Sequence, residues 1–149
     1  MKTSLFTLIL LLIGNISFAQ SADEKAIRTV VDQETTAFYQ GNADKALSYW
    51  LNAPYAAHSH TEKGSGYIRG YDTISKVMKK ALRDNPDIKK TVSKSHDFII
   101  HVNENSAWAT YISDATNGTK KSQEYSARYL EKHAGAWKIV GAFSTPAPK

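Results

Sequence analysis

The pattern of apolar positions divides the chain into a helical half and a strand half. Up to about residue 85, apolar side chains recur every three or four positions, as in helices with one buried face. After Pro86 the period changes to two, as in strands with one buried face. The sequence therefore predicts an α+β domain in which helices pack on one face of a mainly antiparallel sheet.

Three helices are expected in the first half, at residues 23–40, 43–50 and about 71–85. The first has acidic side chains in its first turn, where the helix dipole favours them, and is stopped by Gly41. Asn42 is a good N-cap for the second helix, and Pro54 ends it. A short strand candidate and a glycine-containing loop, at residues 55–60 and 62–70, precede the third helix.

Four strands are expected in the second half, at about residues 95–102, 107–116, 123–132 and 136–144. Turn signals separate them, and the strongest is Asn117-Gly118, because both residues tolerate positive φ. The tail at residues 145–148 contains two prolines and is not expected to continue the sheet. The expected order is α-α-β-α-β-β-β-β.

The first 19 residues have the order of a secretory signal peptide. Lys2 is followed by an apolar run from Leu5 to Ile13 and by small residues at Ser17 and Ala19. A membrane anchor needs about 20 apolar residues, and this run is shorter. We expect cleavage after Ala19, export to the periplasm or the medium, and one domain over residues 20–149 without a membrane anchor.

The composition excludes several classes of function. The chain has no cysteine, which removes disulfides, cysteine zinc sites, thiol nucleophiles and lipid attachment through cysteine. The net charge of +5 would attract nucleic acid if it were concentrated. The lysines are instead spread over a helix face and the connection after it, so no nucleic-acid partner is expected.

Five short segments carry a resemblance to a known family: residues 41–47, 69–74, Arg128, 135–140 and 144–146. In this order they resemble the nuclear transport factor 2-like superfamily, in its SnoaL-like branch. The resemblance implies a cone-shaped domain, with a curved sheet around the long helix, a pocket at one end and frequent dimerisation through the outer sheet face. The superfamily holds isomerases, cyclases, hydrolases and non-catalytic binding domains, so the resemblance assigns no single function.

Glu34 is the most informative single residue, because it lies in the middle of the apolar stripe of the first helix. A carboxylate there either faces a pocket or is paired, since an unpaired buried carboxylate is unfavourable and its pKa rises. Arg128 alternates with Ser126 and Leu130 on the expected concave face and is the natural counter-ion. The pair is a candidate catalytic or ligand-binding site, and a structural ion pair is the alternative.

His58 and His60 lie two residues apart on a short strand, so both side chains point to the same face. They could supply a general acid or base, or two ligands to a metal. His96, Asp97 and His101 are possible third ligands, but no spacing demands them, and no metal or cofactor is expected. A polar strand end is the alternative interpretation.

Aromatic side chains are candidates for two surfaces. Those expected at the pocket wall are Trp50, Tyr67, Trp108 and Tyr111, with the hydrophobic core as the alternative place for them. Tyr125, Ala127 and Tyr129 share the sheet face opposite Arg128, and an outward aromatic row suggests a homodimer.

The sequence leaves three functions open, and whether the chain is an enzyme is undecided. The first is an exported domain whose pocket binds a small organic ligand through Glu34 and Arg128. The second is a SnoaL-like isomerase, cyclase or hydrolase, in which Glu34 or a histidine moves a proton and Tyr67 or Tyr111 donates to an oxyanion. The third is a purely structural dimerisation module. Ligand binding ranks first, because only one member of an acid–base pair can be placed.

Overall fold

The computed structural model of the chain describes residues 22–60 and 66–148. The expected signal peptide and its cleavage point lie outside these residues. The N-terminal helix covers residues 22–39 and is followed by α2 (Ala43–Leu47), α3 (Tyr71–Asp84) and the 3-10 helix η1 (Pro86–Lys90). Every helix in this part of the chain is too short or too polar to span a bilayer.

The sheet has six strands in the order β2-β1-β6-β5-β4-β3. Among these strands of the described residues, β1 and β6 pair in parallel and the other neighbours are antiparallel. The strands are β1 (Ala57–His60), β2 (Tyr67–Arg69), β3 (Thr91–Asn103), β4 (Ser106–Asn117), β5 (Lys120–His133) and β6 (Ala136–Pro146). The α+β class and the expected order of elements are confirmed, with β2 as an additional strand.

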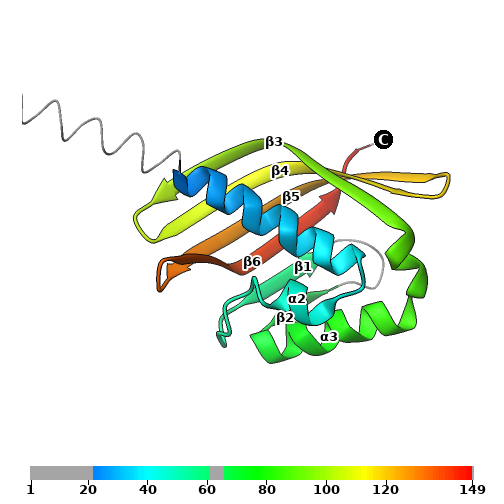
Figure 1. The fold of residues 1–149 in the computed structure, drawn as a ribbon, viewed down its shortest axis with the longest axis horizontal. Coiled ribbons are helices and arrows are strands. Elements are labelled where there is room, and N and C mark those ends of the chain that lie inside the picture. Colours follow the sequence, from blue (N-terminus) through cyan, green and yellow to red (C-terminus); the bar gives the residue numbers. More distant parts are fainter. Residues whose placement is uncertain (1–21, 61–65, 149) are drawn as a thin grey trace, which may run out of the picture.

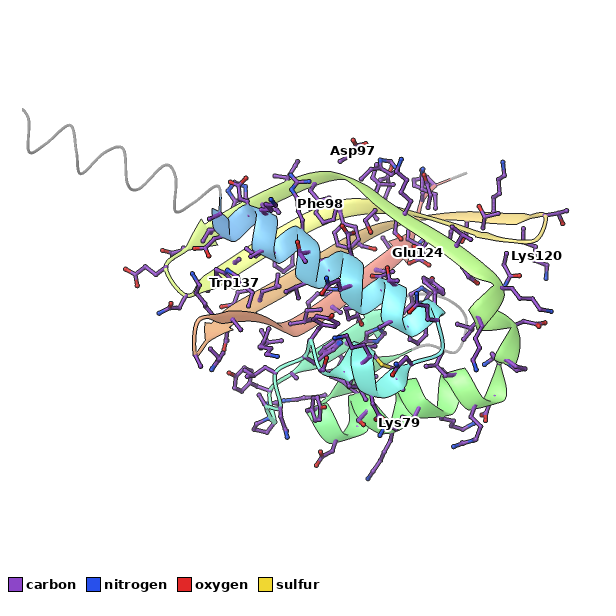
Figure 2. The ribbon with its side chains drawn as sticks, in the orientation of Figure 1. Lys79, Asp97, Phe98, Lys120, Glu124 and Trp137 are labelled. Carbon is purple, nitrogen blue, oxygen red and sulfur yellow. The ribbon has the colours of Figure 1, made fainter. Side chains whose placement is uncertain are left out.

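The sheet curves around the N-terminal helix, which lies across its concave face, while α2 and α3 cover the end beside β1 and β2 (Figure 1). Side chains fill the space between helix and sheet, and Trp137 lies near the start of the helix (Figure 2), where its Nε1–H donates to Asp23 Oδ1 at 2.9 Å. Ile27 and Val31 of the helix and Leu130 and Ile139 of the sheet are fully buried. The apolar stripe that predicted the helix therefore forms the core.

The joint after the N-terminal helix has the expected local chemistry. Gly41 adopts φ +74°, a conformation that glycine accepts without strain. The side-chain oxygen of Asn42 accepts the N–H of Lys45 at 3.0 Å and so caps α2. The helix ends at Leu47 rather than at Trp50, because Trp50 forms a β-bridge to Ile139.

Two strand boundaries differ from the sequence prediction. Residues 67–69, expected to be loop, form β2, which pairs with residues 57–59. β6 continues to Pro146, opposite Glu124, although the tail was not expected to join the sheet. On the other side of β6, the pairing with β1 ends at His60 and Ser144. Pro146 therefore has no partner in β1, and its missing N–H costs no hydrogen bond to that strand. β3 also begins earlier than expected, at Thr91.

Candidate functional site

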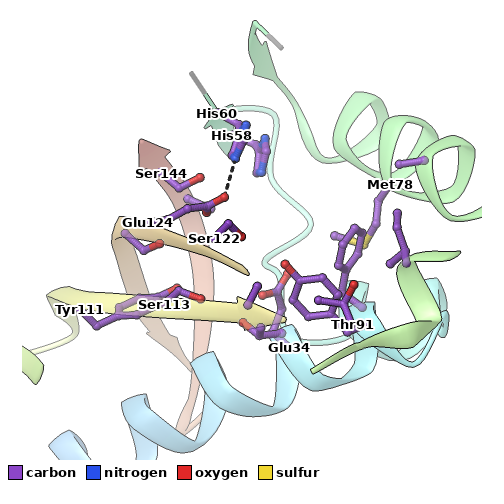
Figure 3. Close-up of a pocket in the computed structure, with 18 of the residues that line it drawn as sticks. Glu34, His58, His60, Met78, Thr91, Tyr111, Ser113, Ser122, Glu124 and Ser144 are labelled. Atoms are coloured by element: carbon purple, nitrogen blue, oxygen red, sulfur yellow. Dashed lines mark hydrogen bonds and ion pairs between the residues drawn. The ribbon is translucent and has the colours of Figure 1, made fainter. Parts of the chain in front are cut away.

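A cavity of about 890 Å³ lies between the N-terminal helix, the concave face of the sheet, α3 and η1. One part of its wall is apolar and comes mainly from the helices: Phe38, Tyr39, Met78, Ala81 and Ile88. The other part is polar and comes mainly from the sheet: His58, His60, Tyr111, Glu124, Ser126, Arg128 and Ser144. Glu34 and Trp50 complete the wall at the helix side, and Figure 3 shows Glu34 and His58 facing this space.

The register of the strands sets the polar wall out in rows. His58 on β1 lies opposite Ala142 on β6, which lies opposite Arg128 on β5. In the next row, His60 lies opposite Ser144, which lies opposite Ser126. Residues opposite one another in a sheet share a face, and the two rows are two residues apart along each strand. Both rows therefore face the cavity.

Glu34 is both paired and turned toward the cavity. Its side chain lies one turn before Phe38 on the buried side of the helix, and the residue is only 5% exposed. Oε1 accepts the indole N–H of Trp50 at 3.1 Å, and Oε2 lies 3.9 Å from Nη2 of Arg128. The placement of Arg128 as the counter-ion follows the sequence expectation.

Arg128 has more donors than partners. Nη1 donates to the carbonyl of Ala127 at 3.1 Å, and the guanidinium lies 5.5 Å from the ring centroid of Tyr111. Nη2 reaches Glu34 only at ion-pair distance, and the buried Nε has no hydrogen-bond partner among the described residues. A guanidinium carries five N–H donors, so this group can still donate hydrogen bonds.

The two histidines of β1 lie in different surroundings. Burial, followed by the nearby charge of Arg128, lowers the pKa of His58 to about 4, so its imidazole is neutral at neutral pH. His60 lies one row further toward the mouth, and its Nε2 is 3.1 Å from Oε1 of Glu124 (Figure 3). The cavity therefore contains one neutral imidazole and one imidazole paired with a carboxylate.

Tyr111 is held rigidly at the cavity wall. Its ring stacks on Phe98 with centroids 4.8 Å apart, and Tyr111 lies opposite Ser126 in the sheet. Burial raises the pKa of Tyr111 above its usual value, and burial does the same for Tyr39. Both phenols stay protonated at neutral pH and keep a donor hydrogen.

Tyr67 and Trp108, expected at the pocket wall, do not line the cavity. Tyr67 is 64% exposed on the short edge strand β2. Trp108 is 41% exposed on the convex face, because it alternates with the buried Ala107 and Ala109 along β4. The alternation along β4 that brings Tyr111 inward turns Trp108 outward.

The candidate third metal ligands are also away from β1. His96 and His101 pair with Ile112 and Trp108, which places both histidines on the convex face. Across residues 22–60 and 66–148, no group of three or more histidine, aspartate or glutamate side chains is arranged to hold a metal ion.

Several lining residues were not identified from the sequence. Glu124 lies four residues before Arg128 on β5 and so shares its face, which strand alternation could have indicated. Lys120 and Lys121 line the cavity from the start of the same strand. Met78 and Ile88 had no such signal, because their contribution depends on how α3 and η1 close over the sheet.

Comparisons with known proteins agree with this fold. A family model described as a SnoaL-like domain matches residues 27–148. No curated protein sequence matches the chain significantly.

The solved structures similar to this chain share little sequence with it. A Mycobacterium tuberculosis protein of unknown function superposes with a TM-score of 0.74 at 14% identity, over 89% of this chain and 76% of that one. A Nostoc punctiforme domain of unknown function with a cystatin-like fold gives 0.69 at 22% identity, over 86% and 79%. A candidate dehydratase of the NTF2-like family from Streptomyces avermitilis gives 0.70 at 12% identity, over 87% and 99%. At these identities the likeness concerns the fold alone.

Proposed function

Because the chain belongs to the SnoaL-like domain family, whose fold carries many unrelated functions, we propose its function from the chemistry of its own pocket. The domain binds a small organic ligand in the cavity beneath the N-terminal helix. The observation that carries the proposal is Arg128, a largely buried guanidinium with unused donors at the wall of a cavity of about 890 Å³. Buried donors left without acceptors are unfavourable, so a ligand that supplies an acceptor gains binding free energy there.

The division of the wall supports the same proposal. Small-molecule sites combine a mostly apolar lining with a few convergent polar groups. Here Phe38, Met78 and Ile88 supply apolar surface for the body of a ligand, and Glu34 and Arg128 supply the polar end. The volume falls within the range of about 300–1,000 Å³ that is typical of such sites.

Binding without catalysis accounts for the histidines better than proton transfer does. A base works best when its pKa lies near the working pH, and His58, with a pKa of about 4, is a weak base at neutral pH. A neutral imidazole still offers one N–H donor and one acceptor to a ligand.

Native mass spectrometry of the protein purified from its own host tests this function. We expect a small molecule to accompany the wild-type protein and to be lost from Glu34→Gln, because that change weakens the interaction that orients Arg128. Asp44→Asn is the matched control, since it makes the same chemical change on a side chain that is 85% exposed. Bare wild-type protein, or equal ligand loss in Glu34→Gln and Asp44→Asn, would contradict the proposal.

A second candidate function is proton-transfer catalysis, as in an isomerase or dehydratase. The observation that favours it is the His60–Glu124 pair, which shares the cavity with Glu34, so that an acid and a base face one space. This candidate predicts that the protein exchanges protons α to the carbonyl of cyclic ketones into deuterium oxide. It also predicts that both His60→Gln and Glu34→Gln abolish the exchange. Exchange that persists in both variants would remove these residues from any catalytic role.

A further inference from the structure

His58 and Arg128 flank one part of the polar wall, with Ala142 between them in the sheet. The three residues lie opposite one another on neighbouring strands, so the outer two are two strand spacings apart, about 10 Å. The residue between them contributes a single methyl group, and all three line the cavity. Ala142 itself is buried in the core, and we call the part of the cavity between the side chains of His58 and Arg128 the slot.

The groups that flank the slot have N–H donors that are not all used by other described residues. His58 makes no hydrogen bond with another described residue, and its nearest ring neighbour is Trp50, with centroids 6.3 Å apart. On the other side, Nη2 of Arg128 has only an ion-pair contact with Glu34, at 3.9 Å. A neutral imidazole keeps one N–H, so donors converge on the slot from both sides.

The acceptors near the slot already have donors. Glu34 accepts the indole N–H of Trp50, and Glu124 pairs with His60. What the wall lacks is therefore an acceptor rather than a donor, and the flanking cation makes a negatively charged acceptor favourable. Lys120 and Lys121 line the same cavity and add positive charge along it.

We propose that the ligand of this pocket is an organic carboxylate, whose carboxylate group occupies the slot between His58 and Arg128 and whose apolar body lies against Phe38, Met78 and Ile88. This inference rests on the proposed binding function and specifies its ligand class. The charged and titratable groups beside the slot are Arg128 and Glu124 from β5, Tyr111 from β4, His60 from β1 and Glu34 from the N-terminal helix. Each of the two acidic groups among them already has a cation or an N–H donor beside it.

A matched set of three probes tests the inference by isothermal titration calorimetry at pH 7. The probes 4-phenylbutanoate, 4-phenylbutanamide and 4-phenylbutylamine share one apolar body and differ only in the polar group. The carboxylate is expected to bind at least about tenfold more tightly than the amide, because hydrogen bonds to a charged acceptor are about twice as strong as neutral ones. The amine is expected to bind weakest, because it brings a cation and further donors to the slot.

The matched variant is the double substitution Glu34→Gln with Arg128→Gln, which removes both charges and leaves the net charge of the protein unchanged. Its affinity for the carboxylate should fall much more than its affinity for the amide, so that the preference for the carboxylate falls to about onefold. His58→Gln, which keeps a neutral donor, should retain most of the preference. The ratio of carboxylate to amide affinity is the readout, because a general loss of packing lowers both affinities together.

Two results would overturn the inference. Equal or tighter binding of the amide or the amine by the wild type would show that the pocket binds ligands but does not select an anion, and the proposed function would stand. Failure of all three probes to bind at millimolar concentration would also reject the carboxylate. In that case native mass spectrometry would still test the proposed function separately, by showing whether a small molecule accompanies the protein.

Discussion

His58 is held neutral in the folded protein beside a permanently charged guanidinium. Its pKa is about 4 in the fold, against an ordinary value of 6.5, chiefly because of burial and then because of Arg128. Between these two pH values the unfolded chain binds a proton that the folded chain does not. The free energy of unfolding therefore falls as the pH drops from about 6.5 to about 4 and is unaffected by this group above pH 7.

This behaviour predicts a difference between the wild type and His58→Gln. Each pKa unit corresponds to about 1.4 kcal/mol, so the wild type should lose up to about 3 kcal/mol of stability through this histidine between pH 7 and pH 4. The variant has no such group and should lose less over the same range. Urea unfolding at pH 7 and pH 4.5 measures the two losses, and parallel losses would show that His58 is not held neutral.

At the residue scale, the sequence could predict Glu34 and its partner but not the details of their environment. A carboxylate in an apolar helical stripe required a partner, and strand alternation pointed to Arg128. The indole of Trp50 as a second partner of Glu34 depends on how α2 ends at Leu47 and on the bridge to Ile139, which no local pattern encodes.

At the scale of elements, Asn42 caps α2, the short helix that lies in the chain between the N-terminal helix and β1, which carries His58. Its side-chain oxygen accepts the N–H of Lys45 at 3.0 Å, so Asn42→Ala should destabilise the protein by about 1 kcal/mol. Asn42→Asp keeps an acceptor at the helix start and should cost less than about 0.5 kcal/mol. Denaturant unfolding distinguishes the two, and equal losses would mean that the cap contributes nothing.

The long elements could be predicted from the sequence, whereas the short ones depend on tertiary pairing. The third helix and the four long strands have repeated periodicity and clear turn signals, of which Asn117-Gly118 is the strongest. β2 has only three residues, and it is a strand because residues 57–59 lie beside it. η1 follows from Pro86 at a helix start, whereas the sequence predicts only a change from helical to strand periodicity at that residue.

The same limit explains which site residues could be predicted. His58, His60 and Arg128 follow from strand alternation, which is a local rule. Tyr67 and Trp108 are candidates for the pocket wall only because they are aromatic. The sequence does not say which sheet face their side chains occupy, and both are exposed. Residue type alone therefore does not place a side chain at a pocket wall.

At the scale of the whole molecule, the convex face of the sheet has a row of exposed apolar side chains. Among the described residues, five are large and exposed: Val92, Ile99, Trp108, Tyr125 and Tyr129. Trp108 lies opposite Tyr129 across β4 and β5, and its ring is 6.4 Å from that of Phe143. We propose that this face forms a homodimer, because closed two-fold dimers are the commonest way to cover such a surface.

The dimer proposal predicts that Tyr129→Asp dissociates the protein, because a charge would be placed in the buried interface. Val77→Asp is the matched control, since Val77 is equally exposed but lies on α3, away from the convex face. Light scattering at several protein concentrations measures the mass. A monomeric wild type, or dissociation by both substitutions, would contradict the proposal.

The export proposal concerns residues 1–19. Cleavage after Ala19 predicts an intact mass, for protein recovered from the native host, that begins at Gln20. Ala19→Arg should prevent cleavage, because the peptidase needs a small residue there. A wild-type protein that retains Met1 would contradict export by this route.

The central claim, that the cavity binds a small organic ligand, is tested most directly by the indole N–H resonances of the three tryptophans in ¹⁵N-labelled protein. Trp50 donates to Glu34 at the cavity, Trp137 donates to Asp23 near the start of the N-terminal helix, and Trp108 lies on the convex face. On titration with a small-molecule extract of the host, the resonance of Trp50 should move while the other two stay in place. No change at Trp50, or equal changes at all three, would contradict the account.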